Sequence, residues 1–206
     1  VALIKEISVM IQSRAAEKGV SVVVETETVG FPYVKSDIGK LRQILINLLS
    51  NAVKFTDEGG VILRCVTGPI PEETNRCHIV IEVEDTGPGI DPARQTKIFD
   101  AFVQGSDERV RKGTGLGLAI CKRFIDFMGG TIELESEVGK GSLFRLRLPA
   151  GIVAAADAET SMETKPKVFG LAQWQKKQHI LIADDHKENR LLLKTLLEDT
   201  GFAVLE

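Results

Sequence analysis

Two asparagines, Asn47 and Asn51, stand four residues apart in the stretch 41–56, which reads LRQILINLLSNAVKFT. At helical spacing they lie on one face, one turn apart, and Lys54 and Phe55 extend that face by another turn. Asparagine favours caps and turns over helix interiors, so two of them inside an apolar helix need a reason. Either the amides bond neighbouring backbone, or their oxygens face a ligand.

A second candidate site follows a strand. Asp85 follows the predicted strand 78–83 after one intervening glutamate. It leads directly into a turn that holds Gly87, Gly89 and Ile90. Aspartate and glycine are common in surface turns, so a lone DxGxG pattern is weak by itself. The pattern gains meaning only together with the other motifs.

A third motif, GTGLGL, opens a helix that we expect to run to Met128. Glycines at a helix start let backbone N–H groups approach an anion closely, and the helix dipole favours negative charge there, so phosphate is the expected ligand. The glycines alternate as GxGxG, which differs from the dinucleotide fingerprint GxGxxG, and no GxxxxGK[ST] motif occurs. The motif consists of Gly113, Thr114, Gly115, Leu116, Gly117 and Leu118.

The aromatic pair Phe99 and Phe102 precedes this motif, and the polar stretch 103–112 separates the two. That stretch holds Arg109 and Lys112 and is too polar to bury itself, so we expect a mobile loop.

Hydrophobic periodicity predicts the elements that must position these residues. Leu41, Ile44, Leu45 and Leu48 form an apolar stripe, which predicts a helix packed on a core, capped by Ser36 or Asp37. The other expected elements are a helix over 3–17 and strands over 20–27, 61–66, 78–83, 131–136 and 142–148. After a linker, a β-α-β pattern follows with a strand over 179–183, a helix over 187–199 and a strand over 202–205.

Composition excludes several functional classes. The formal net charge of the 206 residues is −3, which gives no electrostatic support for a nucleic-acid partner. No apolar run approaches the roughly 20 residues that span a bilayer, and no export signal is recognisable. We therefore expect a soluble, cytoplasmic piece with reduced thiols at Cys65, Cys77 and Cys121, whereas a membrane anchor in a longer parent stays open.

Taken in order, the asparagine helix, DxGxG, the paired phenylalanines and GTGLGL resemble the nucleotide-binding boxes of sensor histidine kinases. These kinases belong to an ATPase superfamily that includes DNA gyrase. The resemblance covers roughly residues 1–149. It implies a two-layer α/β sandwich, the Bergerat ATP-binding fold, in which a mixed, mainly antiparallel sheet is covered by helices on one face. The implied cofactors are ATP and Mg²⁺.

The resemblance also implies roles for individual residues. Asn51 would hold Mg²⁺ through its amide oxygen, an oxygen ligand that suits this cation, with Asn47 beside it contacting metal or phosphate through water. Lys54 would reach the phosphates, Phe55 would pack near the adenine, and Asp85 would accept a hydrogen bond from the adenine amine. The remaining implied ATP-binding residues are Gly87, Gly89, Ile90, Phe102, Arg109, Lys112, Gly113, Thr114, Gly115, Leu116, Gly117 and Leu118.

The end of the chain resembles the start of a response-regulator receiver domain. The apolar run 180–183 ends in Asp184 and Asp185, and two carboxylates at a strand end can bind Mg²⁺ together. Without that resemblance the pair reads as a helix cap. In the receiver family the phosphate-accepting aspartate follows a third strand, and the piece ends before it.

These resemblances imply a domain order and partners. We predict the end of a dimerisation helix over 1–18, an ATP-binding domain over 19–149, a linker over 150–178 and a partial, doubly wound receiver domain over 179–206. The γ-phosphate would pass to a histidine on a dimerisation domain of the same protein. In the family an acidic residue usually follows that histidine, and His78, His179 and His186 do not fit this pattern. The implied partners are this domain and a receiver, within a homodimeric parent.

Two rival readings remain open. In a gyrase-type ATPase, a glutamate one turn before the metal-binding asparagine activates water, and that position here is Asn47. An amide cannot serve as a general base near neutral pH, which disfavours direct hydrolysis. The other rival is a nucleotide-sensing module that binds ATP without transferring phosphate.

Overall fold

The computed structural model describes residues 2–28, 33–70, 73–103, 115–154, 178–183, 190, 193–195, 197–198 and 200–205. The chain divides into two compact units, Val1–Glu159 and Thr160–Glu206. Among the helices within these ranges, none is long and apolar enough to cross a membrane.

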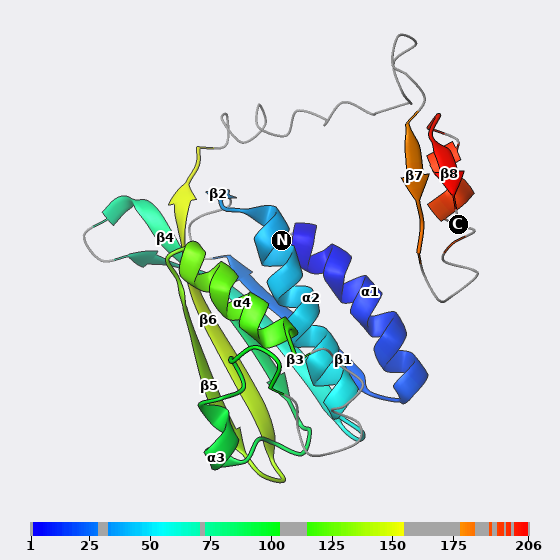
Figure 1. Ribbon diagram of the computed structural model, residues 1–206. Helices are drawn as coiled ribbons and strands as arrows, with labels where there is room; N and C mark the ends of the chain where they lie inside the picture. Colours follow the sequence, from blue (N-terminus) through cyan, green and yellow to red (C-terminus); the bar gives the residue numbers. More distant parts are fainter. Residues whose placement is uncertain are drawn as a thin grey trace. The chain divides into compact units, whose positions relative to one another are not determined.

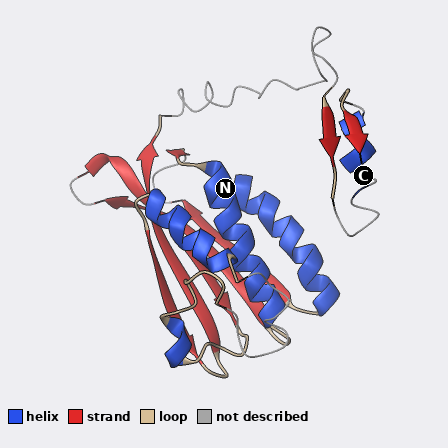
Figure 2. Ribbon diagram, in the orientation of Figure 1, coloured by secondary structure: helices blue, strands red, loops and turns tan. Residues whose placement is uncertain are grey.

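The first unit is a mixed sheet covered by helices on one face, as Figures 1 and 2 show. Strand β3 pairs in parallel with β1 and antiparallel with β4, and β4 pairs antiparallel with β6, which has β5 and β2 along its other side. The sheet is therefore mainly antiparallel, and the predicted two-layer α/β sandwich is confirmed. Its strands are β1 (Ser21–Thr28), β2 (Val34–Lys35), β3 (Gly60–Ile70), β4 (Glu73–Asp85), β5 (Thr131–Glu137) and β6 (Gly141–Ile152).

Three long helices, α1 (Ala2–Lys18), α2 (Ile38–Phe55) and α4 (Gly117–Phe127), lie over one face of this sheet, and the short α3 (Pro92–Gln95) lies near β5 (Figure 1). Helix α2 begins at the predicted cap, where the Asp37 side chain accepts a hydrogen bond from the Lys40 backbone N–H at 3.0 Å. Strands β4 and β6 are longer than predicted because they extend by pairing with each other, as at Arg76 opposite Gly151.

Helix α1 is part of the core of the first unit. Its apolar face is buried through Leu3, Ile4, Ile7, Ile11 and Ala15. The helix packs on α2 and β1. Its role as the end of a dimerisation helix stays a prediction, but the compact unit includes it.

The last residue of α1 caps the end of α2. The Lys18 ammonium donates hydrogen bonds to the carbonyls of Val53, Lys54 and Thr56 at 3.1, 2.7 and 2.6 Å, and it pairs with Asp57 at 3.2 Å. The last carbonyls of a helix have no partner within the helix, and a cation also suits the negative end of its dipole. The two helices are thus joined by polar contacts as well as by apolar packing.

The open face of the sheet carries a row of alternating charges that crosses five strands. Glu25, Arg64, Glu82, Arg145 and Glu133 stand directly opposite one another in the strand register. Successive ion pairs along the row measure 2.9, 3.8, 2.7 and 3.8 Å. Such cross-strand pairs stabilise the sheet face opposite α1, α2 and α4 (Figure 1).

The second unit contains strands β7 (His179–Leu181) and β8 (Ala203–Leu205), which pair in parallel. Helical residues 193–195 and 197–198 stand between them in the sequence. Parallel neighbours need a crossover connection, and a helix commonly supplies it. The two predicted strands are confirmed, and most of the predicted helix lies outside the described residues.

Because Glu82 is shared by two arginines, Glu82→Gln should lower the free energy of unfolding by about 0.5–1 kcal/mol. Urea unfolding in low salt measures the loss, which should shrink in 1 M NaCl because salt screens exposed charges. Glu27→Gln is the matched control, since Glu27 is exposed on β1 outside the row. An equal loss in both variants would contradict a specific contribution from the row.

Candidate functional site

The asparagine face of α2 lies beside the buried apolar stripe of the helix and is less buried than that stripe. Ile44, Leu45, Leu48 and Leu49 are at most 2% exposed, whereas Asn47 and Asn51 are half-buried. The Asn47 amide N–H donates to the Gly117 carbonyl over 3.5 Å, a long hydrogen bond. This contact joins α2 to the first residue of α4.

Helix α4 begins against the same face of α2. A Cβ on Gly117 would lie 3.4 Å from the Asn47 amide oxygen, so the glycine brings the helix start close to that side chain. One turn on, the Cys121 thiol is fully buried and lies 3.8 Å from the Ile44 carbonyl. Burial raises the pKa of Cys121 to about 11, partly offset by a hydrogen bond from Asn47, so this thiol is protonated at neutral pH.

Asp85 is a buried carboxylate, 9% exposed, at the end of β4. Burial raises the pKa of Asp85 above its ordinary value, and the neighbouring charge of Glu84 adds to the rise. The backbone N–H groups of Gly87 and Ser142 lower the pKa without cancelling the effect of burial. The Gly87 N–H donates to the carboxylate at 2.9 Å.

The turn after Asp85 needs its glycines because backbone approaches it from two sides. A Cβ on Gly87 would lie 3.2 Å from the Phe55 carbonyl, at the end of α2. Gly89 has a φ of 70°, and a Cβ there would lie 2.1 Å from the Glu137 carbonyl, on the β5–β6 hairpin. The turn therefore fits between α2 and the hairpin only without these side chains.

The last turn of α2 places Lys54 and Phe55 beside the turn. The Lys54 ammonium lies 4.8 Å from the centre of the Phe55 ring, a cation–π distance. Both side chains are half-buried, so they remain accessible at the end of the asparagine face.

The two predicted phenylalanines have different surroundings. Phe99 packs edge-on against Phe144 of the core, with ring centres 6.4 Å apart. Phe102 is 74% exposed with a φ of 65°, which is unusual for a residue with a side chain, and its N–H donates to the Gly115 carbonyl at 3.0 Å. Phe102 and Gly115 thereby hold the described ends of the connecting segment together.

The structure brings together three of the predicted groups: the asparagine face of α2, the turn after Asp85 and the start of α4. Leu116 directly precedes α4, and the half-buried Leu118 packs on the core. Other predicted site residues lie outside the described part of the chain: Arg109, Lys112, Gly113, Thr114, Asp184 and Asp185.

Sequence reasoning missed two polar residues that hold the turn. Ser136 on β5 accepts a hydrogen bond from the Ile90 N–H at 2.8 Å, and Gln95 of α3 donates to the Ile90 carbonyl at 2.8 Å. Nothing in the sequence distinguishes a serine at a strand end or a glutamine in a short helix. The contact with Ser136 spans 46 residues, which no local pattern reveals.

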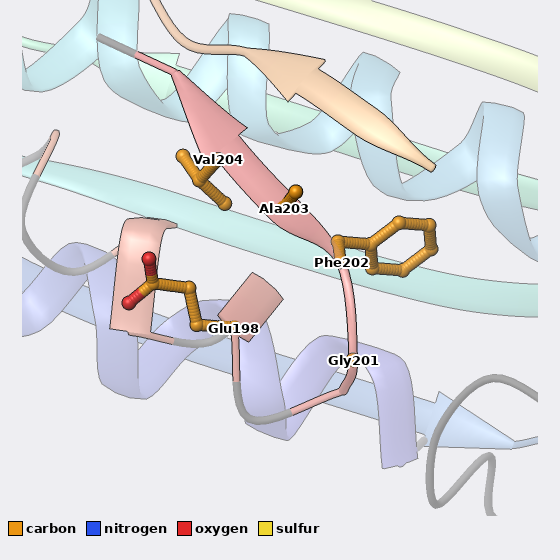
Figure 3. A pocket seen from close by; sticks show the side chains of 5 residues that line it. All are labelled: Glu198, Gly201, Phe202, Ala203 and Val204. Atoms are coloured by element: carbon orange, nitrogen blue, oxygen red, sulfur yellow. The ribbon is translucent and has the colours of Figure 1, made fainter. Parts of the chain in front are cut away.

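The second unit contains a pocket. It is lined by Glu198, Gly201, Phe202, Ala203 and Val204 (Figure 3). Glu198 is the single ionisable side chain among these five residues. Within the described ranges, no three His, Cys, Asp or Glu side chains form a metal-binding group.

Residues 36–152 match the family model described as histidine kinase-, DNA gyrase B- and HSP90-like ATPase. The chain belongs to this ATPase family. The matched range contains α2, the turn after β4 and α4, so the family's ATP-binding domain includes the geometry described above.

Several curated relatives of this ATPase-family chain are sensor proteins. The virulence sensor protein BvgS of Bordetella bronchiseptica is 36% identical over 93% of this chain, and the sensor protein EvgS of Escherichia coli K12 is 40% identical over 84%. The sensory/regulatory protein RpfC of Xanthomonas campestris is 35% identical over 84%. The chain spans 15%, 14% and 26% of these relatives, respectively.

Two solved structures share the fold of this ATPase domain. Full-length ShkA in complex with AMPPNP has a TM-score of 0.62 and 32% identity, covering 98% of this chain and 38% of ShkA. The catalytic domain of histidine kinase ThkA has a TM-score of 0.55 and 28% identity, covering 72% of this chain and 92% of that domain.

Burial of Asp85 predicts how stability depends on pH. Because the folded state raises the pKa of Asp85, its ionisation opposes folding above the folded-state pKa, and this cost disappears below the ordinary aspartate value. Asp85→Asn should therefore raise the Tm at pH 8, and the gain should shrink as the pH falls towards 4. Thermal melts across this pH range measure the difference, with Asp100→Asn, at an exposed position, as the control. A Tm below wild type at every pH would contradict the prediction.

Proposed function

We propose that this chain carries the ATP-binding catalytic domain of a sensor histidine kinase. ATP would lie between the asparagine face of α2, the turn after β4 and the start of α4. The observation that carries this proposal is the buried Asp85 carboxylate, which ends β4 beside a glycine turn packed against the end of α2. An acceptor that is costly to bury is well suited to recognise a specific donor on a ligand.

In this proposal the turn binds the adenine. Asp85 would accept a hydrogen bond from the exocyclic amine, and Gly87 and Gly89 would let the backbone turn beneath the base. Phe55 offers a flat apolar surface that suits a flat base. Ile90 shapes the far end of the same turn.

The phosphates would lie between α2 and α4. Lys54 supplies a positive charge at the end of the asparagine face, and Gly115 and Gly117 leave backbone accessible where α4 begins. Gly113, Thr114, Leu116 and Leu118 would complete this part of the site. Phe102 would flank it, and Arg109 and Lys112 would meet the phosphates from the connecting segment.

The residues present fit Mg²⁺ that arrives with the nucleotide. Asn51 would hold the ion through its amide oxygen and Asn47 would contact metal or phosphate through water, because Mg²⁺ binds few protein oxygens together with phosphates and water. When bound, the ion would neutralise part of the negative charge on the phosphates. The contact of Asn47 with Gly117 directs this side chain to the helix start where the phosphates would lie.

The reaction proposed is transfer of the γ-phosphoryl group to a histidine of a dimerisation domain in a longer, homodimeric parent. The bond between the γ-phosphorus and the bridging oxygen breaks, a bond from phosphorus to an imidazole nitrogen forms, and ADP leaves. Asn47 cannot take a proton from water, which disfavours hydrolysis as the main reaction. His78 is an unsuitable acceptor because its Nδ1 is buried within the sheet.

We also propose that residues 179–206 belong to a receiver domain. The parallel pairing of β7 with β8 supports this, because receiver folds are built from β-α-β units. Asp184 and Asp185 would form its acidic pair for a metal ion. This domain would be a phosphorelay partner of the kinase domain.

Nucleotide binding provides the direct test of the site. With Mg²⁺ present, Asp85→Asn should weaken ATP binding at least about 10-fold, because the base loses a charged acceptor. Titration calorimetry measures the affinity, and Asp100→Asn should bind as wild type does. Equal affinity of wild type for ATP and GTP, or no effect of Asp85→Asn, would contradict the proposal.

Phosphotransfer can be tested by adding the parent's dimerisation segment in trans. We expect acid-labile ³²P on that segment when wild-type chain and Mg-ATP are present, and none on the chain by itself. Asn51→Ala should reduce the labelling rate at least about 10-fold through weaker metal binding. Steady ATP hydrolysis that Asn47→Ala leaves unchanged, without labelling, would instead favour an ATPase.

A further inference from the structure

The turn between Asp85 and Ile90 is held by polar contacts from outside itself. The Ile90 N–H donates to the Ser136 hydroxyl and the Gln95 amide donates to the Ile90 carbonyl, both at 2.8 Å. The Pro88 carbonyl accepts from the Gly139 N–H, also at 2.8 Å. The turn is thereby fixed to the β5–β6 hairpin at two points.

Ser136 connects the two ends of the turn between Asp85 and Ile90. Its oxygen lies 2.9 Å from the Gly141 carbonyl and 3.0 Å from the Ser142 hydroxyl, in addition to the contact with Ile90. A hydroxyl has one proton and two lone pairs, so Ser136 can donate to Gly141 and accept from both Ile90 and Ser142. All its hydrogen-bonding capacity is then used.

These contacts reach Asp85 itself. A Cβ on Gly141 would lie 1.9 Å from the Asp85 backbone carbonyl, so the hairpin and the strand end are in close contact there. The Ser142 N–H is one of the two backbone groups that bond the Asp85 carboxylate. Ser136 therefore contacts two kinds of neighbour. Gly141 and Ser142 lie next to Asp85, and Ile90 lies at the far end of the turn.

Gln95 adds a second attachment. Its amide nitrogen donates to the Ser136 carbonyl at 3.0 Å as well as to the Ile90 carbonyl. Helix α3, which carries Gln95, is capped by Asp91, whose side chain accepts from the Ala93 N–H at 2.8 Å. The glutamine is thus presented from a locally defined element.

We propose that Ser136 and Gln95 are positioning residues that set base selectivity, by holding the turn at a fixed distance from the Asp85 carboxylate. The inference rests on the proposed ATP site. A turn held before binding loses little conformational entropy when the base arrives, and a fixed gap admits only a base whose donor meets the carboxylate. Neither residue touches the nucleotide in this scheme.

The test is the ratio of the dissociation constants for GTP and ATP, with Mg²⁺, at a temperature well below the Tm of each variant. Ser136→Ala and Gln95→Met should each weaken ATP binding about 10-fold, because each variant removes hydrogen bonds that hold the turn, while GTP binding changes little. The selectivity ratio should therefore fall by a similar factor. Ser136→Thr keeps the hydroxyl and should keep the selectivity ratio of wild type. Thr131→Ala, at an exposed position on β5, is the control.

A double variant separates positioning from folding. In the Asp85→Asn background, Ser136→Ala should cause little further loss of selectivity, because the carboxylate it positions is gone. Selective ATP binding by wild type with an unchanged ratio in both Ser136→Ala and Gln95→Met would overturn this inference alone. Equal loss of ATP and GTP affinity would also overturn it, as a purely structural effect. Absence of ATP binding by wild type would overturn the proposed site, and this inference with it.

Discussion

Four side chains of α2, Ile44, Leu45, Leu48 and Leu49, stay out of water only in one rotation of the helix about its axis. Each such side chain contributes about 1.5–3 kcal/mol when buried, so turning the helix by one residue position, about 100°, is prohibitively costly. This constraint decides where the asparagines point. The Asn47 amide meets Gly117 of α4 because the apolar stripe faces the core.

The position of α2 in turn sets the space for the turn after β4. The Phe55 carbonyl at its end approaches Gly87, and the hairpin approaches Gly89 from the other side. Asp85 is buried where these elements converge, and the fold bears the cost of a desolvated carboxylate there. Structures accept such a cost most often at functional sites, where a buried charge has a specific partner to recognise.

Much of this arrangement could be predicted from the sequence, because it depends on local patterns. The apolar stripe predicted α2 and the face that it buries, and alternating apolar residues predicted the central strands. The order of the motifs predicted the family and the fold class. The strand ends and the short strand β2 depend on pairing between distant segments, which local patterns do not contain. The same applies to α1, whose apolar face was visible but whose packing partner was not.

The polar support of the site was the least predictable part. Lys18 contacts carbonyls 35 to 38 residues away, and Ser136 contacts a turn 46 residues away. Both are ordinary residue types in ordinary positions, and their contacts exist only once the sheet has assembled. Asp85, by contrast, stands out in the sequence because an acidic residue between a strand and a glycine turn is a local feature, and its role in binding stays a proposal.

The charge row on the open face has an odd number of members, and both end members are glutamates. Glu25 lies on β1 and Glu133 on β5, which are the outer strands of the sheet at that level. Any edge-to-edge joining of two copies that continued the row would place carboxylate against carboxylate. Exposed strand edges tend to pair with other chains, and like charges at both edges oppose that pairing. The row that stabilises one sheet thus also discourages its extension into a second molecule.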